Sequence, residues 1–146
     1  MRLTLFVIMA CFMISVEANE QEIMKPIHSL FDGMREGNGD KVRKAFGPDA
    51  IFYRAHGELR PGSSAEDFAK AVEQPRDKIW DEKIWDVDIK VDAKLASVWT
   101  KFAFYLGEDL RHCGVNSFQL YHFDDGWKII YLVDTYRDKG YTGKPE

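Results

Sequence analysis

The chain has 146 residues, of which 45% are hydrophobic and 14% aromatic, and its formal net charge is −4. This length favours a single domain, and the aromatic side chains are numerous enough to build a core or to line a cavity. The negative charge and the lack of any long run of like charges argue against a nucleic-acid partner and against a charged interaction tail.

The first part of the chain has the pattern of a secretory signal peptide. Arg2 supplies a positive charge, residues 3–16 are almost continuously apolar, and small residues precede a cleavage point after Ala18. The apolar stretch is shorter than the roughly 20 residues of a membrane-spanning helix. We therefore predict a signal peptide at 1–18, a secreted or periplasmic location and no membrane attachment after cleavage. The mature chain keeps one cysteine, Cys113, which we interpret as a buried small hydrophobe.

Helical patterns follow this segment. Apolar residues recur at helical spacing over residues 23–34, which predicts an amphipathic helix that either starts near Pro26 or kinks there. Gly, Asn and Gly at 37–39 are expected to end this helix. Asp40 is expected to cap a short second helix, which Gly and Pro at 47–48 terminate.

A short strand and a third helix come next. The strand is predicted at 50–54, between a proline and a glycine. Ser63 and Glu66 form a capping-box pattern, which predicts the start of the third helix. Gln74 and Pro75 are expected to end it.

The pattern then changes to an alternation with period two, from Trp80 to Arg137. This alternation predicts four long antiparallel strands. Tight turns are expected to join them at 92–94, 107–109 and 124–126. In the first of these strands the row that contains Trp85 and Ile89 is apolar, and the opposite row is mostly charged, so we expect the Trp85 row to face the core. We predict an α+β fold, a cone-shaped curved antiparallel sheet covered by three N-terminal helices.

Four segments resemble a known superfamily. They are FGPDAIF at 46–52, HCGVNSFQL at 112–120, DGWKI at 125–129 and DTYR at 134–137. These segments are similar to the nuclear transport factor 2-like proteins, and within them to the putative lumazine-binding branch, which is close to the SnoaL-like proteins. The resemblance covers roughly residues 21–137 and implies a nuclear transport factor 2-like domain, which we place at 19–138. The Gly, Lys and Pro residues near the C-terminus predict a flexible tail at 139–146. The superfamily includes isomerases, dehydratases, cyclases, binding proteins and assembly domains, so the fold leaves the function open.

Polar residues in the third long strand are the main candidates for a site. Phe118 and Leu120 mark the even-numbered row as buried, so His112 and Asn116 are expected to point into an apolar interior, where they need hydrogen-bond partners. His112 is the candidate general base, with Asp134 as its orienting carboxylate. The alternative is that His112 only fixes the sheet. The resemblance places Asn116 where isomerases of this fold carry an acidic group, but an amide can only donate a hydrogen bond to a carbonyl oxygen.

Further residues are assigned with alternatives. The last strand is apolar on both of its rows, so Asp134 is expected to face the pocket, to face a dimer partner, or to pair with Arg137. The ligand-binding residues that we predict besides Asn116 are Tyr53, Thr100, Phe102 and Phe118. Aromatic and cationic residues on the outward face of the sheet favour a homodimer interface. The predicted interface residues are Trp99, Lys101 and Tyr105.

The favoured function is the binding of a small, largely apolar molecule in the cone pocket. The alternatives are a cofactor-free lyase or isomerase that uses His112 and Asp134, and a dimeric assembly domain. The four histidines lack the paired spacing of a metal site, so no metal is expected. The chain also lacks a Gly-rich phosphate loop, so no cofactor is expected.

Overall fold

A computed structural model describes the backbone of residues 3–137 and the side chains of residues 19–137. The predicted tail lies outside the described residues, and only the backbone of 3–18 is described for the predicted signal peptide. The helices are α1 (Leu3–Glu36), α2 (Gly39–Ala45) and α3 (Ala65–Glu73). Among the described residues, no helix has the length and apolar character that a membrane crossing requires.

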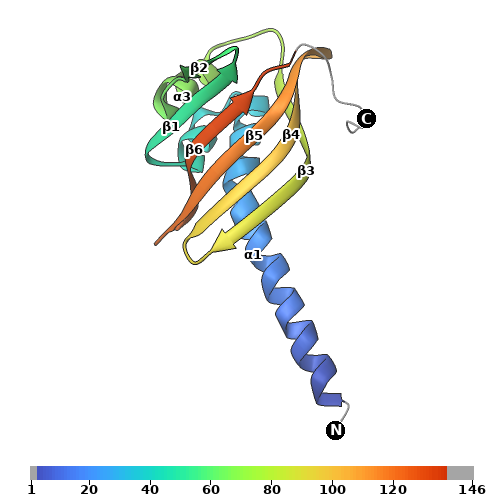
Figure 1. The fold of residues 1–146 in the computed structure, drawn as a ribbon. Coiled ribbons are helices and arrows are strands. Elements are labelled where there is room, and N and C mark those ends of the chain that lie inside the picture. The colour runs from blue at the N-terminus through green and yellow to red at the C-terminus, as the bar shows by residue number, and fades with distance from the viewer. Residues whose placement is uncertain (1–2, 138–146) are drawn as a thin grey trace.

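The first helix differs from the prediction because it continues through Pro26. A proline removes one backbone hydrogen bond, but Ile23 and Ile27 on either side of it are fully buried. Their packing against the sheet offsets the lost bond. The N-terminal half of α1 extends beyond the edge of the sheet, whereas its C-terminal half covers one face (Figure 1).

The caps of the other two helices also lie one or two residues from their predicted places. Asn38, rather than Asp40, caps α2 by accepting a hydrogen bond from the Lys41 amide. Ser64, rather than Ser63, caps α3 through the amide of Asp67. Helix boundaries are commonly displaced by a few residues when they are predicted from sequence.

The strands form one mixed, mostly antiparallel sheet. They are β1 (Phe46–His56), β2 (Glu58–Pro61), β3 (Trp80–Asp92), β4 (Leu95–Leu106), β5 (Asp109–Phe123) and β6 (Gly126–Thr135). The order across the sheet is β2-β1-β6-β5-β4-β3, and only the β1–β6 pair is parallel. The four long strands and their three turns are confirmed, whereas β2 was not predicted. The helices cover the concave face of this curved sheet, which confirms the predicted α+β cone (Figure 1).

A β-bulge in β3 decides which side chains reach the concave face. The register with β4 shifts between Trp85 and Asp88, and Asp86 inside the bulge has a φ of 56°. Because of this shift, Ile84 and Ile89 both lie opposite buried residues of β4, although they are an odd number of residues apart. Before the bulge the inner row is therefore the even-numbered one. The prediction that Trp85 faces the core together with Ile89 is wrong.

Arg76 connects helices α1 and α3 with the start of β3. Its Nη2 donates hydrogen bonds to the carbonyl oxygens of Met34 at 3.1 Å and Val72 at 2.7 Å, near the ends of α1 and α3. The guanidinium also lies 4.4 Å from the ring centroid of Trp80. These contacts hold two helix ends and the start of β3 together, and they fix one side of the space under the helices.

Candidate functional site

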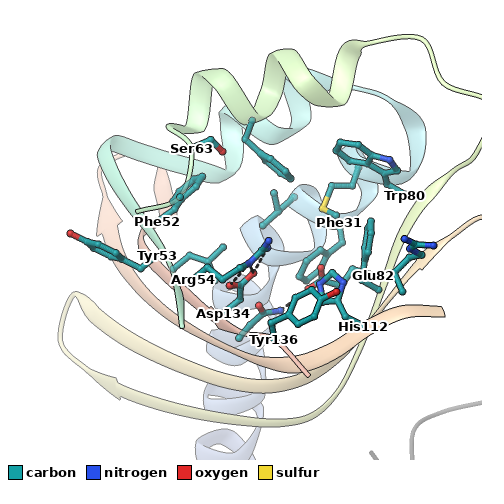
Figure 2. Close-up of a pocket in the computed structure, with 18 of the residues that line it drawn as sticks. Phe31, Phe52, Tyr53, Arg54, Ser63, Trp80, Glu82, His112, Asp134 and Tyr136 are labelled. Carbon is teal, nitrogen blue, oxygen red and sulfur yellow. Dashed lines mark hydrogen bonds and ion pairs between the residues drawn. The ribbon is translucent and has the colours of Figure 1, made fainter. Parts of the chain in front are cut away.

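A cavity of about 800 Å³ lies between the helices and the concave face of the sheet (Figure 2). This volume is within the range of ~300–1,000 Å³ that is typical of small-molecule sites. Its apolar walls consist mainly of Leu30, Phe31, Met34, Phe46, Phe52, Phe68, Trp80, Phe104, Leu106 and Leu132. Its polar lining side chains come mostly from the sheet and from the segment after β2: Arg54, Arg60, Ser63, Glu82, Arg111, His112, Asn116, Asp134 and Tyr136.

A partly buried hydrogen bond joins two of these polar side chains. The Asn116 side-chain amide donates to Glu82 Oε1 at 2.7 Å. Asn116 is only 3% exposed, and Glu82 is half-buried and lines the cavity. The predicted need of Asn116 for a partner is therefore met by a carboxylate from β3. This partner was absent from the predicted site.

Glu82 has an unusual protonation equilibrium. Burial raises the pKa of its carboxyl to about 7, and the hydrogen bond from Asn116 opposes this effect because it favours the charged form. The negative charges of Asp134 and Asp81 raise the pKa further, and the positive charge of Arg54 lowers it. Glu82 is therefore present in both its acid and its base form near neutral pH.

An ion pair lies beside Glu82. Arg54 Nε and Nη2 donate to the Asp134 carboxylate at 2.7 to 3.2 Å, a forked arrangement that fixes both side chains (Figure 2). Strand pairing explains the contact, because Arg54 in β1 lies directly across from Asp134 in β6. Asp134 also lies opposite Asn116. Asp134 therefore lies on the pocket side of the sheet, and its carboxylate binds Arg54. The apolar pattern on both rows of the last strand had left the direction of Asp134 open.

His112 lies in an aromatic environment in the same cavity. Its ring stacks on Tyr136 with a centroid distance of 4.3 Å and an interplanar angle of 19°. The rings of Phe102 and Phe104 lie 5.6 Å and 5.2 Å away. His112 and Asp134 thus line one cavity, as expected for a shared site.

Of the other four predicted ligand-binding residues, Tyr53 alone borders the cavity. Thr100, Phe102 and Phe118 are fully buried and are not part of the cavity lining. Thr100 instead donates its hydroxyl hydrogen within β3 and β4, to the carbonyl oxygen of Trp85 at 2.8 Å or that of Lys101 at 3.0 Å. Tyr53 borders the cavity, but its ring points away from the labelled cluster and lies 6.1 Å from the ring of Tyr131 (Figure 2). The positions of these residues favour packing roles.

The predicted interface residues lie on the opposite face of the sheet from the cavity. Trp99 is 52% exposed. Lys101 forms an ion pair with Asp86 at 2.7 Å, and the Lys83 ammonium lies 5.2 Å from the ring centroid of Tyr105. These residues make an amphipathic outer surface, and Trp99 is its most exposed large aromatic side chain.

Glu82, Asn116, Arg54 and Asp134 form the polar cluster of the cavity, and the sequence did not predict Glu82 or Arg54. Alternation along the apolar Trp85 row places Glu82 outside, and only the bulge reverses this assignment. Arg54 lies on a strand whose parallel pairing with β6 was not predicted. One general signal was present for Glu82, since an Asn expected inside an apolar interior requires a polar partner from another part of the chain.

The described side chains contain no group of three or more His, Cys, Asp or Glu residues suited to holding a metal ion. The polar cluster has one carboxylate bound to an amide and one bound to a guanidinium. Both carboxylates are therefore held by neighbouring side chains.

Comparisons with known proteins agree with the fold. Similar solved structures include a protein of unknown function from Mycobacterium tuberculosis, with a TM-score of 0.69, 16% identity, and coverage of 91% of this chain and 79% of that one. A nuclear transport factor 2-like protein with a cystatin-like fold from Novosphingobium aromaticivorans has a TM-score of 0.69 and 10% identity, and 90% of each chain is covered. A nuclear transport factor 2-like protein of unknown function from Shewanella oneidensis has a TM-score of 0.64 and 15% identity, with 80% and 98% covered.

At these identities the likeness shows the fold alone. A comparison with curated proteins finds no match. The model of the family described as putative lumazine-binding matches residues 18–134, which is most of the chain. The chain therefore belongs to the putative lumazine-binding family, and it has the nuclear transport factor 2-like, cystatin-like fold.

Proposed function

We propose that this protein binds a small, largely apolar molecule in its cone pocket. The observation that carries the proposal is the cavity of about 800 Å³, which has aromatic walls and a compact polar cluster on the sheet side. Sites for small molecules typically combine a predominantly apolar lining with a few polar groups that orient the ligand. An assembly domain does not need such a cavity, so this feature favours ligand binding over assembly alone.

The lining of the cavity favours a flat molecule with one polar edge. Phe52 and Phe104 provide aromatic surface for an apolar body. Glu82, Asn116 and Arg54 provide hydrogen-bond acceptors and donors at the sheet. A ligand with a planar ring system and a carbonyl, hydroxyl or ring N–H group would satisfy both parts. The name of the family supports lumazine, a planar bicyclic molecule, as one probe.

The position of Trp80 provides a direct binding assay. Trp80 lines the cavity, whereas Trp99 lies on the outer face of the sheet. Titration with naphthol or with lumazine is expected to change the tryptophan fluorescence in a saturable way. The change should disappear in a Trp80→Phe variant and persist in the matched Trp99→Phe variant, and isothermal titration calorimetry measures the affinity of all three proteins independently.

Native mass spectrometry of the mature protein purified from its own source would identify a natural ligand directly. The proposal is contradicted if neither probe binds in calorimetry and the purified protein carries no small molecule. A fluorescence change that survives Trp80→Phe and is lost in Trp99→Phe would place binding on the outer face instead.

A specific acid–base role for His112 with Asp134 has weaker support than binding. The Asp134 carboxylate is bound by both arms of the Arg54 fork, and the His112 ring is stacked on Tyr136. These contacts suit two residues that shape and polarise the cavity. They are less suited to a histidine and carboxylate that work as one proton-transferring pair.

A further inference from the structure

We propose that Glu82 is a general base that removes a proton from a carbon atom of the molecule bound in the pocket, and that Asn116 is the residue that positions it. This inference rests on the binding function proposed above. The substrate class is a small, largely apolar carbon acid, that is, a molecule whose C–H bond is weakened by a neighbouring carbonyl or C=N group.

The geometry assigns different tasks to the two oxygens of the Glu82 carboxylate. Oε1 accepts the hydrogen bond from the Asn116 amide at 2.7 Å, which leaves Oε2 to accept a proton. Asn116 is almost completely buried in β5, so its own position is fixed by the sheet. The Glu82 carboxylate is held in place through one oxygen, and its side chain lines a ligand-sized cavity. General-base catalysis requires this arrangement.

The surroundings of Glu82 make it a stronger base than an ordinary glutamate. Phe31, Trp80 and Phe104 line the same cavity, so the carboxylate has fewer water molecules around it than a surface carboxylate has. The pKa of about 7 agrees with this geometry, because a base is most effective when its pKa is near the working pH. The neighbouring Asp134 is instead bound to Arg54, so the two carboxylates of the site have different environments.

Other charged and titratable groups face the same space. Besides Glu82, the charged and titratable residues that line the cavity are Arg54, Arg60, Arg111, His112, Asp134 and Tyr136. Of the nearby charges, those of Asp134 and Asp81 make Glu82 harder to ionise, and that of Arg54 makes it easier. Any pH dependence of the reaction must therefore be assigned to Glu82 by substitution and not by its midpoint alone.

The proton transfer is balanced without a co-reactant. Glu82 Oε2 forms the new O–H bond as the C–H bond breaks, and the C–H electron pair forms a new C=C bond between that carbon and the former carbonyl carbon. The carbonyl electrons move to the oxygen, giving an enolate. In the described contacts, Arg54 donates from Nε and Nη2 to Asp134. Arg54 lines the cavity, and we assign its Nη1 group as the hydrogen-bond donor to the enolate oxygen. The proton on Glu82 then returns to the enolate or to water.

A nitrobenzisoxazole tests this assignment, because it is a planar apolar carbon acid that reacts with a single base. Removal of its ring C–H proton forms a nitrile and breaks the N–O bond, and the electron pair remains on a coloured phenolate. The wild-type protein is expected to accelerate colour formation, and the rate should rise with pH to a plateau with a midpoint near 7. Glu82→Gln should reduce the protein-dependent rate by about a hundredfold or more.

Two further variants separate catalysis from structure. Asp88→Asn changes a carboxylate in the same strand that is 63% exposed, and it should leave the rate unchanged. Asn116→Ala removes the hydrogen bond that favours ionised Glu82, so the midpoint of the pH profile should move to higher pH, together with a lower plateau rate. Glu82→Asp keeps the carboxylate but sets it one methylene further back, so it should retain a small part of the rate. This variant tests the assignment if Glu82→Gln fails to fold.

The inference is overturned if the wild type is no faster than Glu82→Gln, or if Glu82→Asp and wild type react equally fast. It is also overturned if the wild type does not exceed the uncatalysed rate. Binding of the same probe, measured by equilibrium dialysis, distinguishes the two proposals. A probe that binds without reacting contradicts the catalytic role of Glu82 alone. If the probe, naphthol and lumazine all fail to bind and the purified protein carries no small molecule, the binding function is contradicted as well.

Discussion

The raised pKa of Glu82 predicts a pH dependence of stability that a single substitution should remove. In the folded protein burial raises the pKa from an ordinary value of 4.5 to about 7. The folded state therefore holds its proton more tightly than the unfolded state does. The stability that Glu82 contributes is fully present below pH 4.5 and is lost as the pH rises through about 7.

The magnitude follows from the difference between the two pKa values. About 2.5 pH units at about 1.36 kcal/mol for each unit correspond to roughly 3 kcal/mol of unfolding free energy. Glu82→Gln removes the ionisable group and keeps a side-chain oxygen that can accept the hydrogen bond from Asn116. The variant should therefore resemble the wild type in stability near pH 4.5 and exceed it by up to roughly 3 kcal/mol above pH 7.

Urea denaturation of both proteins at a series of pH values measures this effect. The difference in unfolding free energy between variant and wild type is the relevant quantity, because all other titrating groups are common to both proteins and cancel. The matched control is Asp88→Asn, whose carboxylate is largely exposed and should give a difference that hardly changes above pH 5. A Glu82→Gln difference that is constant from pH 5 to pH 8 would refute the reasoning that Glu82 is buried with a raised pKa.

Three other predictions concern the same fold and site. Asp134→Asn removes a negative charge near Glu82, so the midpoint of the Glu82 titration should move to lower pH in the same denaturation series; a midpoint at higher pH would contradict the assigned charges. A Cβ at Gly114 would overlap the Thr135 carbonyl oxygen and lie 2.6 Å from the Phe102 ring, so Gly114→Ala should lower the free energy of unfolding by roughly 3 kcal/mol in urea denaturation. The control Gly57→Ala, where nothing lies within 4 Å of the added Cβ, should lower it by about 1 kcal/mol. The homodimer expected from the sequence predicts that Trp99→Asp converts a dimer to a monomer in analytical ultracentrifugation; a wild-type protein that is already monomeric would contradict it.

Local sequence patterns predicted most of the sheet because their physical causes are local. Side chains alternate along a strand with period two, and tight turns need residues such as Asp and Gly, so 124–126 and the other turns were recognisable. The even-numbered row of β5 was assigned correctly to the concave face, and His112 and Asn116 lie in the cavity as expected. The continuation of α1 through Pro26 was not predictable in this way, because it depends on packing against the sheet.

The chemistry of the pocket depends on contacts between distant parts of the chain. Arg54 meets Asp134 only because β1 and β6 pair in parallel in a particular register. Asn116 meets Glu82 across β4. The residues that flank Arg54 and Glu82 do not identify their partners, since strand order and register are set by how the whole sheet packs against the helices.

The sequence alone thus determined the family, the order of helices and long strands, and the row of β5 that faces the pocket. Only the tertiary structure decided that Glu82 belongs to the site. The extra residue at the Asp86 bulge reverses the facing of every β3 side chain before it, so a carboxylate that simple alternation places in solvent points into the cavity. Burial there, rather than any property of the glutamate itself, raises its pKa to about 7.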